Sequence, residues 1–310
     1  MTGVQTCALP ISFMMSSLQN KIDFAAIVSV TRANINGDPL NGNRPREDYD
    51  GFGVISDVAI KRKIRNRLQD FGENIFVQSD GRETDTYRSL LDRASSDPDL
   101  AAELKKGKDA DTDRFAKTAC EKWTDVRAFG QVFAFKNNKK KAGDEDESGS
   151  QLSVGVRGPV SIQQAVSVDP IEIIDQQITK SVNAEGGKSG KASDTMGMKH
   201  FVRFGLYIIR GSINCQLAEK TGFSDEDAEK IKKALCTLFV NDESSARPAG
   251  TCEVCRVYWW KHAEKMPKET SAMIQRSLKP TPKVETPRSF FDYEIPTPDT
   301  VCQPEIIDLI

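Results

Sequence analysis

A loop rich in asparagine, glycine and arginine, followed directly by a basic segment, is the part of this sequence best suited to bind a ligand. The loop spans residues 34–46 and reads Asn-Ile-Asn-Gly-Asp-Pro-Leu-Asn-Gly-Asn-Arg-Pro-Arg. Residues 58–68 follow, with the cations Lys61, Arg62, Lys63, Arg65 and Arg67. Amide side chains, turn backbone and fixed cations contact phosphates without reading bases. We therefore expect this region to bind an extended polyanion, although a run of cations on a helix also suits a solvated face.

Two arginines of the loop are the strongest candidates to bind phosphate. Arg44 and Arg46 flank Pro45, which restricts the backbone between them. The loop also carries asparagines, whose side chains suit either phosphate contacts or turns. The sequence leaves both roles open for Asn34, Asn36 and Asn41.

The composition excludes a strongly basic protein and a membrane-spanning one. The 310 residues carry a net charge of -2, so a surface for nucleic acid must be a local basic stripe. No apolar run reaches the roughly 18 residues that a membrane-spanning helix needs. Seven scattered cysteines without a secretory signal predict reduced thiols and a cytoplasmic location.

The first residues do not resemble a targeting signal. Residues 1–13 lack a basic start and a long apolar core. We interpret them as a non-native leader, with the natural start at Met14 or Met15, and expect a single domain over residues 14–310.

Apolar patterning predicts how the basic helix is positioned. Residues 22–32 are rich in β-branched side chains and read as a buried first strand. After the loop, Ser56 or Asp57 can cap a helix. Its apolar positions share one face, and they are Ile60, Ile64, Leu68 and Phe71.

The rest of the chain predicts a mixed α+β fold. Residues 72–125 are polar, helical in pieces, and look like an insertion. The segments expected to be strands are 158–167, 171–179, 201–216 and 253–261. Ser224 begins a helix that we expect to run to Phe239. Without the insertion the order is strand, helix, two or three strands, helix, strand, which is the split βαβ pattern of ferredoxin-like and RNA-recognition folds. A proline-rich tail from about residue 266 is expected to wrap the surface.

Two segments are expected to be mobile loops. Residues 136–150 are rich first in lysine, then in acids, then in glycine and serine. Residues 181–194 contain Gly-Gly-Lys-Ser-Gly at 186–190. This is not a nucleotide-binding phosphate loop, because position 182 is Val and no helix follows.

The motifs together resemble one protein family. Besides the loop and the basic helix, they are Asp125-Val-Arg-Ala-Phe-Gly130, Gly158-Pro-Val-Ser-Ile-Gln163, Thr195-Met-Gly-Met-Lys-His200 and Ser244-Ser-Ala-Arg-Pro248. Distributed in order over roughly residues 20–262, they are similar to the backbone subunit of the type I-C CRISPR Cascade complex, a member of the RAMP superfamily.

The resemblance implies a hand-shaped fold. Its parts are a modified RNA-recognition (ferredoxin-like) palm, a helical finger insertion at about 72–150, and a β-hairpin thumb at about 181–198. The resemblance, with the motifs above, gives the expected RNA-binding set, which is Asn34, Asn36, Asn41, Arg44, Arg46, Lys61, Arg62, Arg65, Arg127, Gln163, Met196, Lys199, His200 and Arg247.

The resemblance also implies a non-catalytic role without a cofactor. Several copies polymerise along the CRISPR guide RNA (crRNA) and present it for pairing with target DNA in antiviral defence. The implied protein partners are further copies, a 5′-handle cap subunit, a large subunit, a small subunit and a recruited nuclease-helicase that cuts the DNA.

Other functions compete with this one. Type III relatives cut RNA with an aspartate in the loop after the first strand, so Asp38 with a divalent metal is the alternative, an RNA endonuclease. A monomeric RNA-recognition domain is another. A zinc site at Cys252 and Cys255 lacks four ligands, and their spacing on a strand directs them to opposite faces. With only His200 and His262 as histidines, no hydrolytic triad is expected.

Overall fold

The computed structural model describes residues 16–135, 152–179 and 196–310. The leader, the loop expected at 136–150 and the segment 181–194 lie outside these residues. Of the thumb expected at 181–198, the structure describes only the last residues, from Met196.

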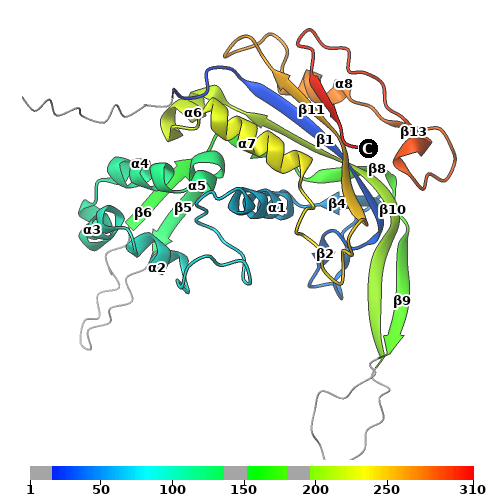
Figure 1. Ribbon diagram of the computed structural model, residues 1–310, viewed down its shortest axis with the longest axis horizontal. Coiled ribbons are helices and arrows are strands. Elements are labelled where there is room, and N and C mark those ends of the chain that lie inside the picture. Colours follow the sequence, from blue (N-terminus) through cyan, green and yellow to red (C-terminus); the bar gives the residue numbers. More distant parts are fainter. Residues whose placement is uncertain (1–15, 136–151, 180–195) are drawn as a thin grey trace, which may run out of the picture.

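A central antiparallel sheet organises the described residues (Figure 1). Its middle strand β1 (Ile22–Ala33) lies between β10 (Met196–Ile213) and β11 (Cys252–Lys261). The full order is β14-β11-β1-β10-β8-β4, with β7 and β9 also paired to β10. The outer strands are β4 (Phe52–Ile55), β7 (Val160–Ile162), β8 (Ala165–Pro170), β9 (Ile173–Thr179) and β14 (Glu305–Asp308). This confirms the mixed α+β class.

Two helices cover one face of the sheet. Helix α1 (Asp57–Asp70) begins after Ser56, whose hydroxyl accepts from the Ala59 N–H. Helix α7 (Asp225–Cys236) begins with a capping box between Ser224 and Asp227 and ends earlier than residue 239. The core between helices and sheet includes Phe24, Ile60, Ile64, Leu68, Ile231 and Trp259. The predicted apolar face of α1 is therefore confirmed.

The strand expected over 201–216 is longer at one end and shorter at the other. It begins at Met196 within a hairpin and ends at Ile213. The Asn214 side chain accepts from the Leu217 N–H and starts α6 (Cys215–Thr221). The sequence does not predict this helix, because its seven residues are too few to show a clear apolar period.

Residues 72–135 and 152–157, called the finger region below after the expected insertion, have their own core. The paired strands β5 and β6 pack against the helices around Phe76, Phe115 and Phe133. The centroid of the Phe133 ring lies 5.1 Å from that of Phe76 and 5.1 Å from that of Phe115. The elements are α2 (Leu90–Ser95), α3 (Pro98–Lys106), η1 (Gly107–Asp109), α4 (Thr112–Lys122), α5 (Thr124–Phe129), β5 (Gly130–Phe135) and β6 (Leu152–Arg157).

The tail does more than wrap the surface. Helix α8 (Ser271–Ser277) packs Ile274 on the sheet face opposite α1, against Tyr258 and Trp260. Strand β14 then adds to the edge of the sheet beside β11. The remaining short elements are β2 (Gly37–Asp38), β3 (Arg44–Pro45), β12 (Thr281–Pro282), η2 (Phe290–Asp292) and β13 (Tyr293–Glu294).

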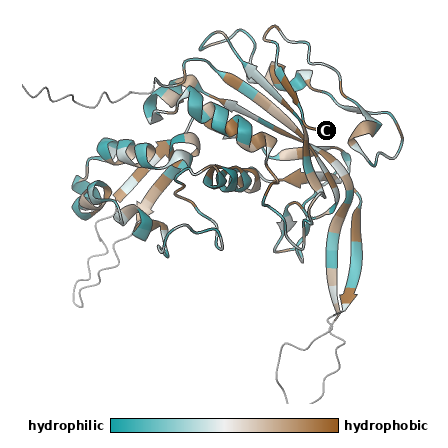
Figure 2. Ribbon diagram, viewed as in Figure 1, coloured by the Kyte–Doolittle hydropathy of each residue, from teal (hydrophilic) through white to brown (hydrophobic). Residues whose placement is uncertain are grey.

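A two-stranded hairpin extends beyond the sheet. Strand β9 pairs with the first part of β10, from Met196 opposite Thr179 to Val202 opposite Ile173. Figure 1 shows this hairpin projecting away from the central sheet and from helices α2 to α5. In Figure 2 it carries hydrophilic residues in its middle and hydrophobic residues towards its far end.

Candidate nucleic-acid interface

The asparagine-rich loop is held in shape by its own side chains. The Asn34 amide donates to the Asn43 carbonyl at 2.6 Å, and the Asn36 Oδ1 accepts from the Ser56 N–H at 2.8 Å. Gly37 has no room for a side chain, since a Cβ there would lie 2.1 Å from Asn43 Oδ1. Asn34 and Asn36 therefore shape the loop, whereas Asn41 is exposed.

An ion-paired cluster joins the loop to the projecting hairpin. Arg44 Nη1 lies 2.8 Å from both carboxylate oxygens of Asp175, and His200 Nδ1 lies 2.7 Å from Asp175 Oδ1. The Arg44 guanidinium, with His200, holds the pKa of Asp175 below its ordinary value. Because Arg44 belongs to the loop while Asp175 and His200 belong to β9 and β10, this cluster fixes the angle between them.

The cations of α1 have different surroundings. Lys61 is partly exposed and pairs with Asp57 one turn earlier, at 3.0 Å. The Arg65 side chain is only 11% exposed, and its Nε donates to the buried Asp125 at 2.8 Å. Arg62 Nη1 donates to the Val77 carbonyl at 2.8 Å, and burial lowers the pKa of Arg62. Arg62 and Arg65 thus anchor the finger region on α1, and Lys61 faces solvent.

The segment before β11 also reaches the loop. The Asn34 N–H donates to the Ala246 carbonyl at 2.8 Å, and Arg247 Nε donates to Asp242 at 2.9 Å. Asp242 also pairs with the buried Lys63 of α1. Burial lowers the pKa of Lys63, and Asp242 opposes that shift.

Arg46 and Asp38 pair across the small β2–β3 ribbon. Arg46 Nη2 lies 3.3 Å from Asp38 Oδ1, which also accepts from the Leu40 N–H at 3.2 Å. Both side chains remain about one third exposed, at 38% and 30%. The aspartate proposed for nuclease chemistry therefore has a structural partner in its own loop.

Two of the expected RNA ligands lie elsewhere. Arg127 forms a bidentate pair with Asp227, with both distances 2.8 Å, and links α5 to α7. Gln163 donates to Gln275 of α8 at 2.9 Å, on the side of the sheet that the tail covers. The structure does not bring these two side chains to the loop, and their binding of RNA stays a prediction.

The far end of the hairpin is apolar. Met196 is 67% exposed, Met198 54% and Ile178 48%. Lys199 is half-buried on the same strand. Exposed apolar side chains at the end of a narrow ribbon suit contact with bases or with another protein surface.

Arg32 is a further candidate that the sequence does not indicate. It lies at the end of β1 with a φ of 52°, which is uncommon for a residue with a side chain. Its guanidinium lies 5.9 Å from the centre of the Phe201 ring, and within the described ranges no hydrogen bond or ion pair engages it. Strain of this kind concentrates at functional sites. Nothing in a β-branched strand pattern indicates such a backbone conformation.

The cysteines form no metal site among the described residues. Cys252 and Cys255 are free, and no group of three or more His, Cys, Asp or Glu side chains there could hold a metal ion. Burial raises the pKa of each thiol to about 11, so both are protonated and unreactive at neutral pH.

Comparison with known proteins identifies the family. The family described as CRISPR-associated protein Cas7 matches residues 20–298. The chain belongs to this family. This confirms, at the level of the family, the resemblance of the sequence to a Cascade backbone subunit.

A curated relative within the family comes from Haloferax volcanii. It is a CRISPR-associated protein Cas7 that is 28% identical over 236 residues. The aligned part covers 74% of this chain and 66% of the relative, just under two thirds of its length.

Two solved structures are similar to this chain. One is titled a CRISPR RNA-guided surveillance complex, pre-nicking, with a TM-score of 0.49, 16% identity, and coverage of 82% of this chain and 81% of that one. The other is titled a CRISPR RNA-guided surveillance complex, with a TM-score of 0.42, 15% identity, and coverage of 80% and 72%. In the described part of this chain, none of the helices is long and apolar enough to cross a membrane.

Proposed function

We propose that this protein is a non-catalytic backbone subunit of a type I-C CRISPR interference complex. Copies polymerise along the guide RNA and present it for pairing with target DNA. The observation that carries the proposal is the meeting of four separate segments at one end of the sheet. They are the loop at 34–46, the start of α1, the β9–β10 hairpin and the segment 242–248.

The exposed cations of this region suit an RNA backbone. Phosphates are bound by arginine, lysine and amide groups, and such contacts leave the bases free for pairing. From the expected set we propose Asn41, Arg44, Arg46, Lys61, Met196, Lys199, His200 and Arg247 as direct contacts, and we add Arg32. We propose that supporting residues hold these contacts in place, namely Asn34, Asn36, Arg62, Arg65 and Arg127. Gln163 would contribute to RNA binding from the sheet face that the tail covers.

The strand order supports the palm, finger and thumb assignment. Strands β11, β1, β10 and β8 are adjacent in that order, with α1 and α7 on one face, as in a split βαβ fold. We propose residues 14–310 as one domain, with fingers at about 72–150 and a thumb at about 181–198. The thumb would interrupt pairing between guide and target at regular intervals.

The proposed partners follow from this role. They are guide RNA, target DNA through the guide, further copies, the cap, large and small subunits, and the nuclease-helicase. We also propose a cytoplasmic location, since the described residues hold six free cysteines, which is typical of a reducing compartment.

The alternative, a metal-dependent RNA endonuclease, is not favoured. Its aspartate, Asp38, already accepts hydrogen bonds from Arg46 and from the Leu40 N–H. Cleavage of complementary RNA in Mg²⁺ that Asp38→Ala abolishes would support this alternative instead.

Guide-RNA binding by Arg44 tests the proposal. Arg44→Ala should weaken RNA binding and reduce the slope of log K against log salt by about 0.7, the contribution of one phosphate contact on a single strand. The measurement is fluorescence anisotropy of labelled guide RNA over a salt series. Arg114→Ala is the matched control, because Arg114 is an exposed, ion-paired arginine on the fingers. If both variants keep the wild-type slope, Arg44 does not bind phosphate.

A further inference from the structure

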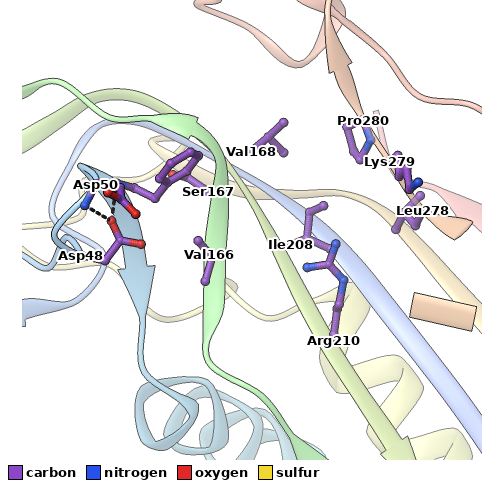
Figure 3. A pocket seen from close by; sticks show the side chains of 11 residues that line it. Asp48, Asp50, Val166, Ser167, Val168, Ile208, Arg210, Leu278, Lys279 and Pro280 are labelled. Atoms are coloured by element: carbon purple, nitrogen blue, oxygen red, sulfur yellow. Dashed lines mark hydrogen bonds between the residues drawn. The ribbon is translucent and has the colours of Figure 1, made fainter. Parts of the chain in front are cut away.

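A groove lies on the sheet face that the tail covers, and its end at Asp48 and Asp50 begins two residues after Arg46 of the loop. It has a volume of about 500 Å³ between strands β8 and β10 and the segment that follows α8. A second hollow of about 370 Å³ continues it along α8, and the two share Arg210, Leu278 and Lys279. The apolar lining of the larger hollow includes Val166, Val168, Ile208 and Leu278 (Figure 3).

Arg210 is an unpaired cation in this groove. Its side chain is half-buried, and no described residue forms a hydrogen bond or an ion pair with its guanidinium. Burial lowers the pKa of Arg210, and no acidic neighbour opposes the shift. Burying a charge without a partner is costly, so an anionic group bound here would stabilise the site.

The two ends of the groove carry opposite charges. Asp48 and Asp50 line one end of the larger hollow, and Figure 3 shows them far from Arg210. Arg276 joins Arg210 and Lys279 in the smaller hollow, whose lining contains no acid. A nucleic-acid backbone would meet like charge at Asp48 and Asp50. A peptide with cations at one end and acids at the other matches both ends.

The chain itself contains such a peptide. Residues 139–147 read Lys-Lys-Lys-Ala-Gly-Asp-Glu-Asp-Glu, with three cations, two small residues and four acids in order. They belong to the connection between β5 and β6 on the fingers, which lie on the opposite side of the molecule from α8 (Figure 1). A second copy, rather than the same one, is therefore the source of the peptide that suits the groove.

We propose that the groove of one copy receives residues 139–147 of an adjacent copy. Residues 144–147 lie against Arg210, Arg276 and Lys279, Ala142 and Gly143 cross the apolar floor, and the lysines face Asp48 and Asp50. This inference rests on the proposed polymerisation, in which copies lie next to one another. It adds a protein contact between copies that is separate from the RNA.

Peptide binding tests the groove without RNA. The probe is a fluorescein-labelled synthetic peptide of residues 138–148. The protein is the full chain carrying Asp144→Asn, Glu145→Gln, Asp146→Asn and Glu147→Gln, so that its own segment does not compete. We expect saturable binding in anisotropy at 150 mM salt, a salt level given as roughly physiological. Arg210→Gln with Lys279→Gln should raise the Kd at least about tenfold, as loss of a charge-assisted hydrogen bond does.

Two controls separate binding from folding and from general charge. Lys268→Gln removes a cation on the tail outside both hollows and should leave the Kd unchanged. Arg210→Gln should not lower the thermal unfolding midpoint, because it removes an unpaired, half-buried charge. A probe in which Asn and Gln replace the four acids should not bind.

Each result decides the inference separately from the proposed function. Absence of peptide binding, or an unchanged Kd in the groove variant, overturns the groove contact, even if the chain still assembles on RNA. Loss of single-stranded RNA binding in the groove variant, without peptide binding, would also overturn it. Peptide binding by a chain that does not bind guide RNA would overturn the proposed function and leave the groove as a protein-binding site.

Discussion

Arg32 differs from the other cations of the interface in its backbone. Its φ of 52° is strained for a residue with a Cβ, and no described side chain neutralises it. A left-handed conformation costs an ordinary residue about 1–2 kcal/mol, and its exposed contact with Phe201 returns about 0.5–1 kcal/mol. The conformation therefore costs more than the visible contact supplies, which is expected if Arg32 serves RNA binding.

Arg32→Gly should change stability and binding in opposite directions. Glycine adopts this backbone conformation without strain, so the free energy of unfolding should stay equal or rise by about 0.5 kcal/mol. RNA affinity should fall, and Arg32→Lys, which keeps the charge, should retain most of it. Urea unfolding and RNA anisotropy measure the two effects. A less stable Gly variant with unchanged RNA affinity would make Arg32 a structural residue.

The sequence singles out the loop residues as candidates, but it does not show which of them face solvent and which hold the loop in shape. Arg44 and Arg46 could be chosen from their positions beside Pro45. That Asn34 and Asn36 hold the loop, and that Arg65 is paired, depends on Asn43, Ser56 and Asp125, and no local pattern gives such pairings. Arg32 could not be found, because its unusual φ arises where β1 ends against β10.

Helix α1 offers a matched test at the level of elements. Lys61 has an exposed pair with Asp57, whereas Arg65 donates to an Asp125 carboxylate that is 1% exposed. Lys61→Ala should lower RNA affinity with a stability change within about 0.5 kcal/mol. Arg65→Ala leaves a buried carboxylate without its cation and should cost about 3 kcal/mol.

Urea unfolding of both variants, with RNA binding measured on the folded protein, separates these roles. If Lys61→Ala destabilises the fold as much as Arg65→Ala, the division between a binding residue and an anchoring residue is wrong.

The tail is attached to the first strand by a buried ionic cluster. Asp23 is fully buried, with Oδ2 lying 2.8 Å from His262 Nε2 and 3.0 Å from Lys21 Nζ. Lys21 also donates to Ser271 at the start of α8, at 2.8 Å. Burial alone would raise the pKa of Asp23, but its hydrogen bonds, that of His262 first, hold it below the ordinary value.

Asp23→Asn should therefore have a pH-dependent effect. A carboxylate with a lowered pKa contributes stability above its unfolded pKa of 3.8, and this contribution is lost as pH falls through the folded value. The variant should be less stable by about 3 kcal/mol at neutral pH, and the difference should shrink below about pH 4. Urea unfolding at both pH values measures it. Asp299→Asn, at an exposed site, should show little change at either pH.

The sequence predicted the palm elements better than the tail. Long, capped and apolar elements such as β1 and α1 were found within a few residues. The tail was expected only to wrap the surface, because its few apolar residues, such as Ile274, Leu278 and Tyr293, follow no regular period among the prolines. They form a core because the sheet directs Ile27, Tyr258 and Trp260 towards the same face. Only the tertiary structure shows that these side chains meet.

At the scale of the whole molecule, the fold separates two kinds of contact. The loop, α1 and the hairpin meet at one end of the sheet, where we place the guide RNA. The tail covers the other face and forms the groove at Arg210 that we assign to an adjacent copy. A chain of copies needs both an RNA track and surfaces between copies, and this arrangement provides them on different sides.

The most direct test of the account is the number of copies on guide RNAs of increasing length. Native mass spectrometry of the protein with RNAs lengthened in equal steps should show one more copy for each fixed increment of nucleotides, with no cleavage of the RNA. A single copy on every RNA, whatever its length, would contradict the backbone role and indicate a monomeric RNA-binding domain.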